Sequence, residues 1–221
     1  MIFMKNKKIL LTITGFALIG LFAFASKYYK DYESDRLGFL SQKDSTIFVR
    51  EYSPQFGDEN AKVFLIEFLD PECESCRQFY PQIKNLLKEF KGKVKLVVRY
   101  APFHRNSKFA IKALEASRKQ NKYWEALELL FKYQPNWGNH HNPQPNLIFE
   151  YLPEIGINIE KLKSDMNDPE IDKRILQEVS DLKQLNVRRT PTFFVNGKPL
   201  ERFGIEYLKK AIQEEIKNSY Q

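Results

Sequence analysis

The chain has 221 residues, of which 43% are hydrophobic and 14% aromatic, so it can form a folded core and is neither disordered nor collagen-like. Its net charge of +7 includes no run of five basic residues, and this scattered charge does not predict nucleic-acid binding. The chain has two cysteines, Cys73 and Cys76, which excludes a scaffold held by several disulfides.

A segment near the N-terminus is predicted to meet a membrane. Residues 9–25 (ILLTITGFALIGLFAFA) carry no charge and follow Lys5, Lys7 and Lys8, a pattern typical of a transmembrane helix or a signal peptide. Basic residues before such a segment predict a cytoplasmic N-terminus. We therefore expect the rest of the chain on the periplasmic side of the cytoplasmic membrane, whether or not the segment is cleaved.

Cleavage of this segment is left open by the sequence. A small-x-small motif ends at Ala25 and has the form of a signal-peptidase site, which would release a soluble exported protein. Tyr28 and Tyr29 follow directly and favour an interfacial aromatic belt next to an uncleaved anchor. We favour the anchor, with residues 1–25 as signal-anchor and residues 26–45 as a polar spacer.

The elements after the spacer begin with strands. Residues 46–50 (TIFVR) form a short β-rich run. A turn-rich stretch follows this run and ends in Gly57-Asp58-Glu59-Asn60. Residues 63–69 (VFLIEFL) are almost continuously apolar, as expected for a parallel strand buried on both faces, and Glu67 is the one acid inside it. Residues 94–100 (VKLVVRY) give another strand.

An amphipathic helix is predicted between these two strands. Apolar residues recur at three- and four-residue spacing from Cys76 to Phe90, with Pro81 inside the pattern. The order of strand, helix and strand predicts a βαβ unit with both cysteines at the start of its helix. Roughly residues 106–185 are then mainly helical, and a strand, a hairpin turn and a closing helix over residues 205–218 complete the chain.

The Cys73-Glu74-Ser75-Cys76 motif indicates redox chemistry. The chain lacks the second cysteine pair of a zinc site, and a disulfide closing so small a loop would be a poor structural staple. A helix N-terminus stabilises a thiolate, so we expect Cys73 to be the nucleophile and Cys76 the resolving thiol that closes the disulfide. The carboxylate of Glu74 opposes this stabilisation and predicts a less oxidising couple than in the strongest oxidases.

A Thr190-Pro191 pair before the sequence Phe-Phe-Val-Asn-Gly completes a resemblance to a known family. With the Cys-x-x-Cys motif and the proline-containing helix, it resembles the DsbA-like thioredoxin-fold thiol:disulfide oxidoreductases over roughly residues 60–218. The resemblance implies an α/β thioredoxin-like fold with a helical insertion domain at about residues 106–185, preceded by the N-terminal hydrophobic helix. Residues 46–221 would form the DsbA-like domain.

The resemblance also implies roles for single residues. Cys73 resembles the attacking cysteine, Cys76 the resolving one, and Pro191 a cis-proline that faces them. The backbone of Thr190 would then pair strand-fashion with an extended substrate. Glu67 resembles the buried acid that relays a proton to or from the resolving cysteine, and burial would raise its pKa.

The function predicted on these grounds is thiol-disulfide exchange with cysteines of exported proteins, by a monomer with a membrane redox partner and without cofactor, metal or nucleic acid. Glu74 and Ser75 stand where strong oxidases of the family have Pro-His, and an isomerase or a reductase stays an alternative. A copper-binding chaperone that uses both cysteines with His140 or His141 is the alternative from another class.

Overall fold

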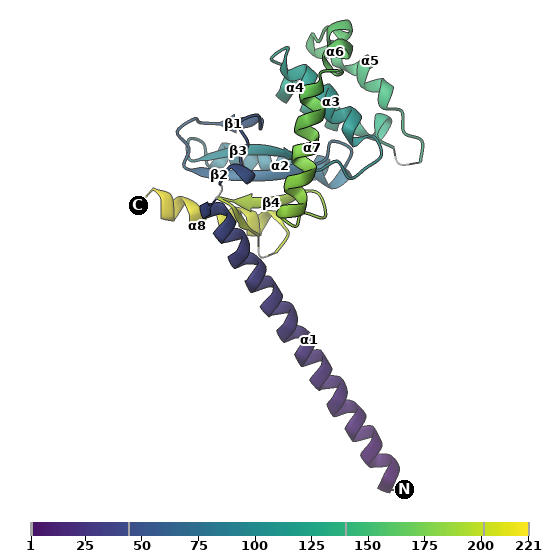
Figure 1. Cartoon of the computed structure of the whole chain (residues 1–221), viewed down its shortest axis with the longest axis vertical. Helices are drawn as coiled ribbons and strands as arrows, with labels where there is room; N and C mark the ends of the chain where they lie inside the picture. Colours follow the sequence, from purple (N-terminus) through teal and green to yellow (C-terminus); the bar gives the residue numbers. More distant parts are fainter. Residues whose placement is uncertain (1, 44, 140, 201, 221) are drawn as a thin grey trace.

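A long N-terminal helix leads into an α/β domain in the computed structural model (Figure 1). The structure describes residues 2–43, 45–139, 141–200 and 202–220, and for residues 2–10, 12, 34, 38–43 and 45 it describes the backbone alone.

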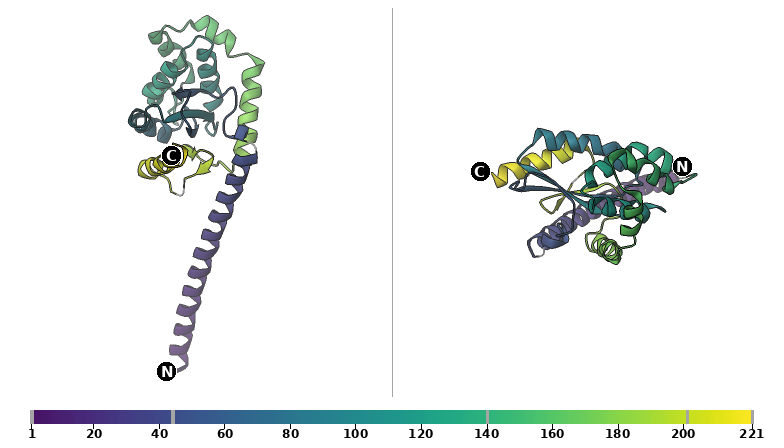
Figure 2. Two further views of the ribbon diagram at one scale, coloured as in Figure 1. Left: turned by 90° about the vertical axis from the view of Figure 1, so that its left-hand side faces the viewer. Right: turned by 90° about the horizontal axis from the view of Figure 1, so that it is seen from above.

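Helix α1 (Ile2–Lys43) continues through both the predicted apolar segment and the predicted spacer (Figures 1 and 2). The first proline of the chain is Pro54, so no proline interrupts this helix. The side chains of Ile9, Leu10 and Thr12, which belong to the apolar segment, lie outside the described residues. Among the residues that are described, no helix has the length and apolar character needed to cross a membrane.

The C-terminal part of α1 packs against the domain. Leu37 is 3% exposed and lies in one apolar cluster with Phe48 and Phe194. Arg36 donates a hydrogen bond from its Nη1 to the carbonyl of Gln184. The helix is therefore joined to the domain by packing as well as by the chain itself.

A five-stranded sheet has the order β1-β3-β2-β4-β5. The strands are β1 (Gln55–Gly57), β2 (Val63–Leu69), β3 (Val94–Tyr100), β4 (Thr192–Val195) and β5 (Lys198–Pro199). Strands β2 and β3 pair in parallel, while β1, β4 and β5 join antiparallel. The predicted parallel strand over residues 63–69 is confirmed, and it lies at the centre of the sheet.

Helix α2 (Glu74–Glu89) connects β2 to β3, so the predicted βαβ unit is confirmed. The region between β3 and β4 contains the helices α3 (Ser107–Arg118), α4 (Tyr123–Trp137), α5 (Ile148–Tyr151), α6 (Ile159–Asp165) and α7 (Pro169–Gln184), with short 3-10 turns at Pro145–Leu147 and Leu152–Ile155. Helix α8 (Ile205–Ser219) closes the chain. The mainly helical character predicted for about residues 106–185 is confirmed.

The alternation of side chains along β2 divides the core between two faces of the sheet. Leu65 and Leu69 lie in a larger cluster with both cysteines, whereas Ile66 and Phe68 lie in the smaller cluster that receives Leu37. Glu67 follows the period of Leu65 and Leu69, so the pleat directs it to the face that carries the cysteines.

The prediction of a strand over residues 46–50 was wrong. Its start lies in a 3-10 turn, Ser45–Ile47, and the first strand is β1, which lies in the stretch expected to be turns. Ile47 and Phe48 of this run are still buried, and the carbonyl of Ile47 accepts a hydrogen bond from the guanidinium of Arg99. Arg99 in turn binds Glu178 and Asp181 of α7, so a buried ionic cluster holds the run in place without strand pairing.

Candidate functional site

Cys73 occupies the N-cap position of α2, with φ −79° and ψ 121°. The turn after β2 sets this geometry: the amide of Cys73 donates to the carbonyl of Asp70 at 3.0 Å, and the amide of Glu72 donates to Asp70 Oδ1 at 2.9 Å. The Cys73 side chain therefore meets the unpaired amides of the first helical turn. Only 7% of the residue is exposed, and it lies at the surface end of the larger core cluster.

Cys76 lies one turn further along α2 and is completely buried. Both cysteines are free. Hydrogen bonding to the Cys76 thiol, to the side chain of Thr190 and to the backbone amides of Cys76 and Ser75 lowers the pKa of Cys73 to about 5. Burial, reinforced by the hydrogen bond to Cys73, raises the pKa of Cys76 well above its ordinary value. At neutral pH the pair therefore offers one thiolate and one buried thiol.

The loop before β4 brings the other predicted motif to Cys73. The Thr190–Pro191 peptide bond is cis, the geometry that the resemblance implies. The Cys73 Sγ lies 3.4 Å from the carbonyl oxygen of Thr190, across 117 positions of sequence. Thr190, Pro191 and both cysteines therefore lie together at one end of α2.

Glu67 lies in the sheet on the same side as the cysteines. Its neighbours across the sheet are Val98 and Phe193, and it is 1% exposed. Within the described part of the chain its Oε2 atom has no hydrogen-bond partner. Burial, together with the negative charge of Cys73, raises the pKa of Glu67 to about 8. The carboxyl group is therefore mainly protonated at neutral pH, and it is not a strand-end glutamate that reaches solvent.

Sequence reasoning left out a second group of polar residues beside the cysteines. Asp70 is fully buried, and its Oδ2 accepts hydrogen bonds from the amides of Phe103 and His104 and from the hydroxyl of Ser107. The His104 Nδ1 lies 2.7 Å from the same oxygen, and this hydrogen bond raises the pKa of His104. Asp70 and His104 follow the adjacent parallel strands β2 and β3, so both lie at the same edge of the sheet. This shared edge was the feature of the sequence that could have indicated their contact.

Gln134 of α4 also holds the cysteine loop. Its Nε2 donates to the carbonyls of Pro71 at 2.8 Å and Cys73 at 3.0 Å, while its Oε1 accepts from Arg77 Nε at 2.9 Å. The amide satisfies backbone groups that would otherwise be buried without partners. No local pattern could have identified Gln134, since its role depends on how α4 packs against α2.

The histidine pair of the copper alternative is described only in part. His140 lies outside the described residues, and His141 is exposed in the loop after α4. In the ranges that the structure describes, no three His, Cys, Asp or Glu side chains gather so that they could hold a metal ion.

Comparison with known proteins identifies similar chains. The thioredoxin family model matches residues 50–214. The chain is 28% identical over 144 residues to the Na(+)/H(+) antiporter NhaA of Herminiimonas arsenicoxydans, which covers 65% of this chain but 22% of that protein. The chain therefore spans less than a quarter of the length of this relative.

Two similar proteins have lengths closer to that of this chain. Disulfide bond formation protein D of Bacillus subtilis is 30% identical over 176 residues, which cover 74% of this chain and 77% of that protein. The solved structure of oxidised BdbD from Bacillus subtilis superposes with a TM-score of 0.67 at 28% identity, covering 75% of this chain and 93% of the other. The α/β expectation is confirmed as a thioredoxin-like fold.

Proposed function

The chain belongs to the DsbA-like thiol:disulfide oxidoreductases of the thioredoxin family, and on this premise we propose that Cys73 and Cys76 exchange disulfides with cysteines of exported proteins. The observation that carries the proposal is the difference between the two thiols at the start of α2. The pKa of Cys73 is lowered to about 5 by its hydrogen bonds, whereas burial raises that of Cys76. Cys73 therefore forms and releases the mixed disulfide with the substrate, whereas Cys76 resolves it.

In the oxidising direction, a substrate thiolate attacks the Cys73 sulfur of the Cys73–Cys76 disulfide. The bond between the two sulfurs breaks, Cys76 leaves with the electron pair, and a mixed disulfide joins Cys73 to the substrate. A second substrate thiolate then attacks the substrate sulfur of this mixed disulfide and releases Cys73 as a thiolate. The substrate loses two electrons and two protons. The protein takes up both electrons and one proton, which Cys76 binds, while Cys73 stays a thiolate and the other proton goes to the solvent.

Glu67 supplies the proton that Cys76 needs when it leaves. Its raised pKa, about 8 because of burial, keeps a proton available at neutral pH on the face of the sheet that carries the cysteines. In the reverse direction the ionised Glu67 accepts the proton of Cys76 before Cys76 attacks the mixed disulfide. Thr190 and Pro191 bind the substrate backbone beside Cys73.

The low pKa of Cys73 favours the oxidising direction. A stable thiolate in the reduced protein makes Cys73 a good leaving group and raises the reduction potential of the disulfide. The relatives named for disulfide bond formation support this direction over isomerisation or reduction. A redox partner would then have to reoxidise the pair after each cycle.

We also propose that the domain over residues 46–221 works as a monomer on the periplasmic side of the membrane, tethered through residues 1–25 and the spacer of residues 26–45. The lysine-bearing leader supports this orientation. The large apolar side chains of α1 that are exposed, from Leu11 to Phe24, support contact with a lipid environment.

A pair of serine variants tests the division of labour between the cysteines. Cys73→Ser should abolish reduction of insulin, because no accessible nucleophile remains. Cys76→Ser should accumulate substrate in a mixed disulfide, because resolution is lost. The assignment fails if Cys76→Ser remains a full catalyst or if the trapped disulfide forms in Cys73→Ser.

A further inference from the structure

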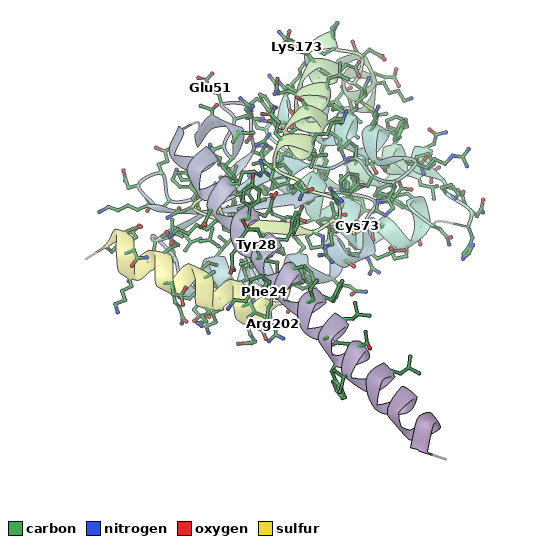
Figure 3. The ribbon with its side chains drawn as sticks, turned by 60° about the horizontal axis from the view of Figure 1, so that its bottom comes forward. Phe24, Tyr28, Glu51, Cys73, Lys173 and Arg202 are labelled. Atoms are coloured by element: carbon green, nitrogen blue, oxygen red, sulfur yellow. The ribbon has the colours of Figure 1, made fainter. Side chains whose placement is uncertain are left out.

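A cleft beside the candidate redox site has walls from three separate segments of the chain. It encloses about 670 Å3, and its walls are α1 between Lys27 and Glu33, the loop that leads into β4, and the β4–β5 hairpin with the residues that follow it. Its volume falls in the range of clefts that hold ligands, about 300–1,000 Å3. Figure 3 labels Phe24 and Tyr28 on α1, Arg202 after the β4–β5 hairpin, and Cys73.

The cleft lies next to the loop that contacts Cys73. Pro191 lines it, and the carbonyl oxygen of the preceding residue, Thr190, lies 3.4 Å from Cys73 Sγ. An extended polypeptide advances about 3.3 Å per residue. A substrate whose cysteine reacts at Cys73 therefore has the adjoining few residues within reach of the cleft.

Aromatic side chains line the cleft. Phe203 is 54% exposed and stacks on the buried Phe193, with 6.4 Å between the ring centroids. Tyr29 of α1 adds a second ring that is 55% exposed. Exposed rings on a rigid support offer contact area to a polypeptide at a low cost in conformational entropy.

Basic side chains predominate around these rings. Lys27, Lys30, Arg189 and Arg202 all line the cleft, and none of them has an ion-pair partner among the described residues. Of the two acids there, Glu33 is held by Arg36 at 2.7 Å. The cleft therefore has a net positive charge that favours carboxylates in whatever occupies it.

We propose that this cleft binds an extended segment of the substrate polypeptide that carries aspartate or glutamate within a few residues of the reactive cysteine. Through Lys27 and Lys30, helix α1 forms one side of this cleft and contributes to substrate specificity, in addition to its role as a tether. The proposal rests on disulfide exchange at Cys73, the proposed function, and adds to it the class of substrate.

The test compares two peptides that differ only in the residues next to one cysteine pair, aspartates in one and lysines in the other. The full-length protein, in a neutral detergent, oxidises each peptide, and kcat/KM is divided by the rate with uncharged dithiothreitol, so that changes in thiol chemistry cancel. We expect about a tenfold preference for the acidic peptide at about 0.05 M salt, which disappears at about 1 M salt because of screening.

Charge-reversal variants locate the source of this preference. Lys27→Glu combined with Lys30→Glu should remove or invert it, and Arg202→Glu on the facing wall should reduce it in the same direction. The control is Lys173→Glu, a lysine of α7 that is 77% exposed and lies at the other end of the domain, which should keep the preference (Figure 3).

Equal rates with the two peptides, or a preference that survives both reversals, would overturn the proposal. It would also be overturned if the reversals changed only binding to vesicles of anionic phosphatidylglycerol, because the cleft would then serve a lipid surface. Failure of the proposed function itself would be visible separately, as the absence of exchange with dithiothreitol.

Discussion

Replacing Glu67 with glutamine should make the protein more stable and less active. In the folded chain, burial raises the pKa of Glu67 from 4.5 to about 8. Between these pH values the folded state binds a proton that the unfolded state has released, so the stability of the native protein falls as pH rises through this window. Each pH unit changes the unfolding equilibrium about tenfold.

From pH 4.5 to pH 7 this dependence amounts to at most about 3 kcal/mol, since Glu67 is 1% exposed and solvent screens it little. Glutamine has nearly the shape of the protonated acid and cannot ionise. We therefore expect Glu67→Gln to be up to about 3 kcal/mol more stable at pH 7 and indistinguishable from the native protein below pH 4.5. Urea unfolding of the reduced proteins at both pH values measures the difference, with the exposed Glu206→Gln as the control.

The same change should slow the proton transfer at Cys76. Loss of a general acid or base costs about a hundredfold at least, so the mixed disulfide should persist about a hundred times longer during reoxidation of the reduced protein. Alkylation in acid followed by mass spectrometry measures its lifetime. A stability gain that is the same at pH 4 and pH 7, or a mixed disulfide with an unchanged lifetime, would refute the reasoning.

Three further predictions concern other parts of the molecule. His104→Ala should lower the thiolate fraction of Cys73 at pH 5 about threefold, because a cation beside the site is lost, and His104→Lys should restore it; absorbance at 240 nm reports both. Arg99→Leu should destabilise the fold by about 3–5 kcal/mol at pH 7, because two carboxylates lose their buried partner, and part of this loss should be regained in urea titrations at pH 5 as they become protonated. The native chain should resist carbonate extraction and keep its own N-terminus, whereas a soluble product that begins at Ser26 would establish cleavage.

The sequence predicted the central elements well because their patterns are local. The apolar run of β2 and the periodic helix after Cys76 each fit one secondary structure, and together they define the βαβ unit. The start of α7 is equally local: Asp168 precedes Pro169, and its side chain accepts the hydrogen bond from the amide of Glu170 at 2.9 Å. The site residues could be predicted from the sequence because both cysteines and the Thr190-Pro191 pair belong to recognisable motifs.

Other features depend on contacts between distant segments, which no local pattern carries. Residues 46–50 have the composition of a strand, but the guanidinium of Arg99 and the smaller core cluster hold them in a turn. Gln134 and His104 reach the cysteine loop only after α4 and the loop after β3 have packed against it. The wall of the cleft formed by α1 likewise requires a helix that continues beyond the apolar segment.

The attachment of α1 to the domain decides where the chain can be shortened. A soluble fragment that begins directly before β1 would lose Leu37 from the smaller core cluster and would lose the partner of the Arg99 guanidinium at Ile47. It would also lack Arg50, which binds Asp181 at 2.7 Å. Such a fragment would contain most of the family match, which begins at residue 50, but would expose an apolar patch and leave a buried charge cluster incomplete. A fragment that begins ahead of Glu33 keeps these contacts, so the domain that folds is longer than the domain that sequence similarity outlines.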